Sequence, residues 1–130
     1  MTAVRIINWI ARITGIITLL LGLTFWVTSI NSIPGIHMLV GITFTLSFLI
    51  LSIIMVFSSG VRLLGVIGIV YALIIPVFGV IQAGLLVGDL HWLIRLAHML
   101  VGIGAMLVIQ TIYTRYGHLK QPAQQTAAAS

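Results

Sequence analysis

The sequence predicts an all-α integral membrane protein, a four-helix bundle whose helices run up, down, up and down across the bilayer. Apolar residues make up 61% of the 130 residues, charged residues only 5%, and the mean hydropathy is +1.28. This composition excludes a water-soluble fold. A helix needs about 20 apolar residues to cross a hydrocarbon core about 30 Å thick, and inside lipid only a helix or a closed barrel satisfies the backbone. Four such runs occur, at about residues 6–30, 35–57, 62–87 and 92–113.

These runs account for nearly the whole chain. The first contains Arg12, is too long for a cleaved signal and lacks a small-residue cleavage site, so we expect it to be retained. The connections between runs are too short to hold another domain. Residues 1–114 are therefore expected to form the bundle. Residues 115–130 are polar and offer little to bury, which predicts a disordered tail.

The positions of the charges predict the orientation. One side of the bilayer receives only Arg95, balanced by Asp89, and the other side receives the remaining cations: Arg5, Arg12, Arg62, Arg115 and Lys120. By the positive-inside rule both termini are expected to be cytoplasmic, in a bacterial inner (plasma) membrane. The expected surroundings are the lipid bilayer. No nucleic-acid partner is expected, because the cations are neither clustered nor interleaved with exposed aromatic residues.

An internal repeat predicts that the bundle is built from a duplicated helical hairpin. Arg-x-x-Gly occurs at Arg12 and Arg62, and His-Met-Leu-Val-Gly begins at His37 and His98. Two hairpins of the same direction form a parallel repeat about an axis along the membrane normal, which sets the two histidines at one depth. The second hairpin carries 11 extra residues between its arginine and its histidine, and we expect them to lengthen the third helix and the outer loop.

The repeated histidines are candidate metal ligands. The second and fourth helices of an up-and-down bundle are diagonal neighbours, so His37 and His98 are expected to face a common centre near the outer side. Gly41 and Gly102 follow them at i+4 on the same helix faces and leave room beside each ring. A porphyrin would fit this space. The same inward faces continue with Phe44, Thr45, Phe48, Ala105 and Ile109.

Other interpretations of these residues remain open. A membrane histidine near a helix end is commonly interfacial or hydrogen-bonded, and the glycines could serve close helix packing. The alternative function is a non-enzymatic membrane scaffold or subunit with structural histidines. A proton-coupled transporter is disfavoured because the only acid is Asp89, at the outer rim. A non-haem metal is disfavoured because two imidazoles, in a chain without cysteine, leave most metals under-coordinated.

With His37, Gly41, His98 and Gly102, the sequence resembles the small four-helix membrane cytochromes of b type. The resemblance implies one haem b per chain between two inward-facing histidines. Diheme members need a second pair near the cytoplasmic side, where this chain offers only His118. Two imidazole ligands leave iron no open site, which favours electron transfer with a quinol, a periplasmic redox protein or a small oxidant. No catalytic residue is assigned, and whether the chain is a membrane oxidoreductase stays open.

Two further residues are candidates for cofactor binding. His91 and Arg95 precede His98 by seven and three residues and share its helix face toward the outer surface. Arg95 could pair with a haem propionate, or it could extend to the interface or pair with Asp89. His91 could be a propionate partner, a ligand or neither. The third helix also carries a surface of small residues for bundle packing or a homodimer: Gly65, Gly68, Ala72, Gly79 and Ala83.

Overall fold

A computed structural model describes residues 2–28 and 34–128, with side chains described as far as Leu119. Every regular element in these ranges is helical: α1 (Thr2–Val27), α2 (Pro34–Val56), α3 (Arg62–Ile81), the short 3₁₀ helix η1 (Gln82–Gly84) and α4 (His91–Ala128). Four helices are long and apolar enough to cross a membrane. The all-α class and the membrane-length helices predicted from the sequence are confirmed.

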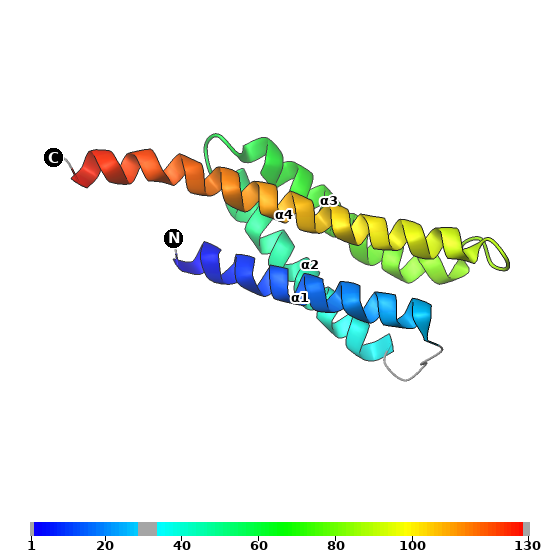
Figure 1. The fold of residues 1–130 in the computed structure, drawn as a ribbon. Helices are drawn as coiled ribbons and strands as arrows, with labels where there is room; N and C mark the ends of the chain where they lie inside the picture. Colours follow the sequence, from blue (N-terminus) through cyan, green and yellow to red (C-terminus); the bar gives the residue numbers. More distant parts are fainter. Residues whose placement is uncertain (1, 29–33, 129–130) are drawn as a thin grey trace.

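Figure 1 shows how the ends of the helices are distributed. Both chain termini lie at the same end of the molecule as the turn between α2 and α3, and the connection between α3 and α4 lies at the opposite end. In the described residues α2 contacts each of the other three long helices, whereas α1 and α3 do not contact each other. The hydrophobic core is therefore centred on α2.

The inward faces expected for α2 and α4 are buried. Phe44 and Phe48 of α2 are at most 3% exposed, and Ala105 and Ile109 of α4 are completely buried. Thr45 is half-buried. Spacings of three and four residues place each set on one helix face, which is why the sequence could identify them.

Small residues bring α3 close to α2. A Cβ atom at Gly65 would lie 2.5 Å from the backbone nitrogen of Val56 and 2.8 Å from the carbonyl oxygen of Ser52. Gly68 packs against the Ser52 hydroxyl, which donates a 2.8 Å hydrogen bond to the Phe48 carbonyl. Both glycines are buried. This part of the small-residue surface of α3 therefore serves packing within the bundle.

The third helix ends earlier than its apolar run predicts. Helix α3 ends at Ile81, not near residue 87, and has 20 residues against 26 in α1. The chain then tightens into η1 and turns through Leu86 and Gly88, which have φ angles of 46° and 108°. These left-handed conformations are incompatible with a continuing right-handed helix. The 11 extra residues are divided among three places. Helix α3 runs 19 residues past Arg62 against 15 for α1 past Arg12, the connection has nine residues against six, and His98 lies seven residues after the start of α4 against three for His37 in α2.

The two Arg-x-x-Gly motifs also occupy different places. Arg62 is the first residue of α3, whereas Arg12 lies ten residues beyond the start of α1. At a rise of about 1.5 Å per residue, the motifs stand about 15 Å apart relative to the starts of their helices. The arginines therefore mark different positions along the two helices, although the sequence aligned them as equivalents.

The fourth helix continues past its expected end near residue 113. The backbone is helical to Ala128, over most of the segment 115–130 expected as a disordered tail. Alanine and glutamine, which are frequent there, are good helix formers, so a helix can continue without a core to pack on. The side chains beyond Leu119, Lys120 included, lie outside the described residues.

Candidate functional site

The structure brings the two repeated histidines together. His37 lies in the first turn of α2, and His98 lies about two turns into α4. Their ring centroids are 6.4 Å apart, and their ring planes meet at 51°. Both side chains are half-buried. Helices two and four of the chain therefore present one imidazole each to a shared site, as the sequence predicted.

Each imidazole also packs against a phenylalanine from the preceding helix. Phe25 of α1 meets His37 edge-on with ring centroids 5.5 Å apart, and Phe78 of α3 lies 5.8 Å from His98. All four long helices thus contribute an aromatic ring to the site. The sequence analysis missed both phenylalanines, because neither belongs to a repeated motif.

A glycine lies under each histidine ring. A Cβ atom at Gly22 of α1 would lie 3.4 Å from Cε1 of His37, and one at Gly79 of α3 would lie 3.5 Å from Cε1 of His98. Gly22 precedes His37 by 15 residues and Gly79 precedes His98 by 19, a difference of about one helical turn. Because of this offset, the sequence does not show that Gly22 and Gly79 occupy equivalent places beside the two histidines, and the sequence analysis missed Gly22.

The glycines at i+4 are not explained by helix packing. A Cβ atom at Gly41 would meet nothing closer than Cγ2 of Thr18 at 3.7 Å, and one at Gly102 would meet Cδ2 of Leu19 at 3.4 Å. Both are ordinary van der Waals contacts, unlike those of Gly65. Packing of the described helices therefore tolerates a methyl group at both positions.

The buried nitrogens of the pair lack partners. Nδ1 of His37 and Nδ1 of His98 are both buried, and neither has a hydrogen-bond partner. A buried polar atom left without a partner costs about 1–3 kcal/mol. The site therefore holds two unsatisfied nitrogen atoms, on rings that lie next to each other.

The other predicted site residues lie toward the connection between α3 and α4. Nδ1 of His91 donates a 3.1 Å hydrogen bond to the Leu85 carbonyl, which closes this connection onto the start of α4. Arg95 and Asp89 are exposed, and the structure records no ion pair between them in the described segments. No recorded contact joins His91 or Arg95 to the histidine pair. Their roles toward a cofactor stay predictions.

The described residues contain no larger ligand set. No group of three or more histidine, cysteine, aspartate or glutamate side chains that could hold a metal ion occurs among them. Zinc sites in proteins use three or four protein ligands. Two imidazoles leave a zinc ion short of protein ligands, whereas a porphyrin brings four nitrogens of its own, so the donor set suits haem better than free zinc.

Comparisons with known proteins add no assignment. The chain matches no protein-family model, no curated protein and no solved structure. The comparisons therefore provide neither a family nor a function. What can be inferred about function comes from the residues and from the geometry of the site formed by His37, His98 and their neighbours.

Proposed function

We propose that this chain is a membrane b-type haem protein that holds one haem b between His37 and His98 and acts in electron transfer. The observation that carries the proposal is the 6.4 Å separation of the ring centroids. Two imidazoles on opposite sides of one metal atom, with nitrogen–metal bonds of about 2 Å and nitrogens about 1.1 Å from the ring centroid, have centroids about 6.3 Å apart. The two separations agree.

The two unsatisfied nitrogens support the same proposal. Each histidine has a buried Nδ1 without a partner, and either ring nitrogen of a neutral imidazole can bind a metal. Binding iron on one nitrogen satisfies part of this deficit. The backbone of Thr18 forms a hydrogen bond with the His37 ring, whereas the structure records none for His98 among the described residues. The unsatisfied nitrogen of His98 is therefore the stronger support for a bound ligand, because unsatisfied polar groups in lipid are costly.

We also propose that the bundle is an up-down-up-down arrangement of two related hairpins. Support comes from the matched surroundings of the two histidines, each of which rests on a glycine and a phenylalanine of the preceding helix. The orientation with both termini in the cytoplasm is part of the proposal, supported by the five cations assigned to that side. The site would then lie near the periplasmic face.

The residues of the site have distinct roles in this function. His37 and His98 would hold the iron from two helices, which would leave it no coordination position for dioxygen. Gly22 and Gly79 let the imidazoles approach the neighbouring helices, and Phe25 and Phe78 exclude water from the rings. Gly41 and Gly102 leave room beside the macrocycle. When bound, haem b supplies a one-electron couple, which the apolar surroundings tune.

The outer surface near the site favours a lipid-soluble electron donor. An apolar groove of about 610 Å³ between α3 and α4 includes Phe78 and Val101 in its lining. Phe78 is also the ring that packs on His98. A quinol moving in the bilayer could therefore reach within one side chain of the ligand, and a periplasmic redox protein or a small oxidant would serve as the second partner.

Axial ligation can be tested by substitution. His37→Ala and His98→Ala should each abolish the low-spin b-type absorption of the reduced protein, while His118→Ala, an exposed residue on α4, should keep it. His91→Ala tests the one other histidine near the outer end. A wild-type spectrum in both the His37 and the His98 variant would overturn the proposal. Purified chain that stays colourless after reconstitution with haem would favour the scaffold function.

A further inference from the structure

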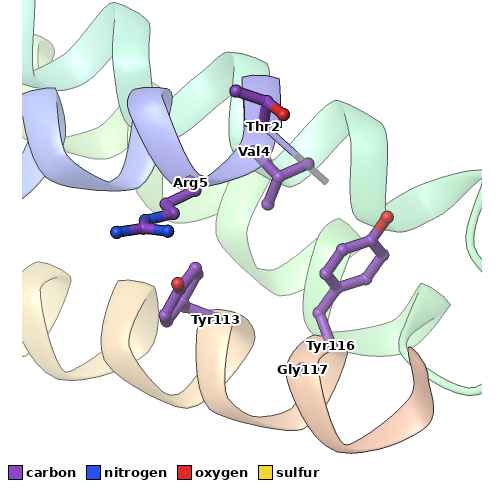
Figure 2. A pocket seen from close by; sticks show the side chains of 6 residues that line it. All are labelled: Thr2, Val4, Arg5, Tyr113, Tyr116 and Gly117. Atoms are coloured by element: carbon purple, nitrogen blue, oxygen red, sulfur yellow. The ribbon is translucent and has the colours of Figure 1, made fainter. Parts of the chain in front are cut away.

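A second pocket lies at the end of the molecule that carries both termini. It has a volume of about 350 Å³ and opens between the start of α1 and the later part of α4 (Figure 2). The residues that line it are Thr2, Val4, Arg5, Tyr113, Tyr116 and Gly117. Figure 2 shows the Arg5 guanidinium extending from α1 toward Tyr113 of α4. Neither residue takes part in the haem site.

The charge in this pocket has no counterion among the described residues. Arg5 is exposed, and the structure records no ion pair for it in the segments it describes. The chain has a single acidic residue, Asp89, in the connection between α3 and α4 at the opposite end. No carboxylate side chain can therefore reach Arg5 from the same chain, and among the described residues the guanidinium is available to an external anion.

The polar groups around Arg5 can all donate hydrogen bonds. Tyr113 is half-buried, and its hydroxyl has no recorded partner among the described side chains. Thr2 adds a second hydroxyl at the start of α1, where the first backbone N–H groups lack intrahelical acceptors. An arginine fork with hydroxyl and N–H donors matches the oxygens of a phosphate group better than any neutral or cationic ligand.

The walls of the pocket favour a ligand with an apolar part. Val4 and the two tyrosine rings supply apolar surface beside the donors, and the pocket lies at helix ends, where lipid headgroups surround a membrane protein. We propose that this pocket binds the phosphate group of an anionic phospholipid in the adjacent leaflet. Free phosphate shares the headgroup chemistry but has no acyl chains to contact the apolar walls.

The proposal is independent of haem binding. The pocket lies at the end with the termini, whereas His37 lies in the first turn of α2, which starts at the other end. Lipid binding and the haem spectrum can therefore be measured separately. In the proposed orientation this end faces the cytoplasm, whose leaflet contains anionic lipids in many membranes. Binding in detergent does not depend on that orientation.

The test measures binding to the full-length chain in a neutral detergent by calorimetric titration. The probes are dihexanoyl phosphatidylglycerol, dihexanoyl phosphatidylcholine and inorganic phosphate. We expect phosphatidylglycerol to bind most tightly, Arg5→Gln to weaken it about tenfold, and Tyr113→Phe to weaken it several-fold. Arg62→Gln is the matched control, an exposed arginine at the same end outside the pocket, and should change the affinity less than twofold.

Each contrary result overturns a stated part of the proposal. Equal losses in the Arg5 and Arg62 variants would mean general surface charge and no site. Equal affinity for phosphatidylcholine would exclude selection of an anionic headgroup, and inorganic phosphate binding as tightly as phosphatidylglycerol would assign the pocket to free phosphate. Thermal unfolding without ligand checks that Arg5→Gln is folded, and Tyr113→Phe, which removes only a hydroxyl, provides an independent second variant.

Discussion

Replacing Gly65 by alanine tests the packing of α3 on α2. The new Cβ atom would lie 2.5 Å from the Val56 nitrogen and 2.8 Å from the Ser52 carbonyl oxygen. Both neighbours are backbone atoms of α2, so only a separation of the helices can relieve the overlap. Overpacking of this kind destabilises a folded protein by about 3 kcal/mol at the upper end of its usual range. Replacing glycine by alanine in a helix stabilises it by about 1 kcal/mol through helix propensity. We expect Gly65→Ala to destabilise the bundle by about 2 kcal/mol.

Gly41→Ala is the matched control for this prediction. Its Cβ atom meets nothing closer than Thr18 Cγ2 at 3.7 Å, so only the propensity gain of about 1 kcal/mol applies and the apoprotein should become slightly more stable. The free energy of unfolding of each variant, without haem, can be measured by titration with a denaturing detergent in mixed micelles and followed by circular dichroism.

Two outcomes would refute the reasoning about these glycines. If Gly65→Ala is as stable as the wild type, the helices do not approach as closely as the structure has them. If Gly41→Ala loses as much stability as Gly65→Ala, position 41 is closed by packing, and the open space beside His37 that the haem proposal uses does not exist.

Four further predictions concern the glycines of the site, the haem stoichiometry, the topology and the packing. Gly41→Leu and Gly102→Leu should lower the haem content while the chain still inserts, and full occupancy in both, measured as haem per protein, would point to another helix face. A ratio of haem to protein near one is expected for the wild type, whereas a ratio near two would require ligands beyond His37 and His98, with His91 the first candidate. A reporter fused after Ser130 should be active in the cytoplasm and inactive outside, and the reverse result would invert the orientation proposed from the cations. Tyr71→Phe removes the 3.2 Å hydrogen bond to the Val101 carbonyl. The loss should lower the free energy of unfolding by about 0.6 kcal/mol, a typical value inside membranes, and leave the haem spectrum unchanged. A changed haem spectrum in this variant would link Tyr71 to the site.

Much of the fold could be predicted because it depends on short-range properties of the sequence. The number and approximate position of the long helices follow from the length of each apolar run, since lipid leaves the backbone no alternative. The burial of Phe44, Phe48, Ala105 and Ile109 follows from the 3.6-residue period, which groups each set on one face. The convergence of His37 and His98 needed one more premise, that helices two and four are diagonal neighbours.

The tertiary structure alone decided how far each helix is shifted along its neighbour. The sequence aligned Arg12 with Arg62, but the glycines under the two histidines, Gly22 and Gly79, stand at different distances from those arginines. The same contacts bring Phe25 and Phe78 to the imidazoles, and no motif marks either residue. The shift of one helix along its neighbour depends on which small residues let the two backbones approach, as Gly65 does against α2. It is therefore a property of a pair of helices. Apolar run length and periodicity are properties of one helix at a time, so the sequence by itself determined the helices and their faces, while packing determined which residues surround the histidine pair.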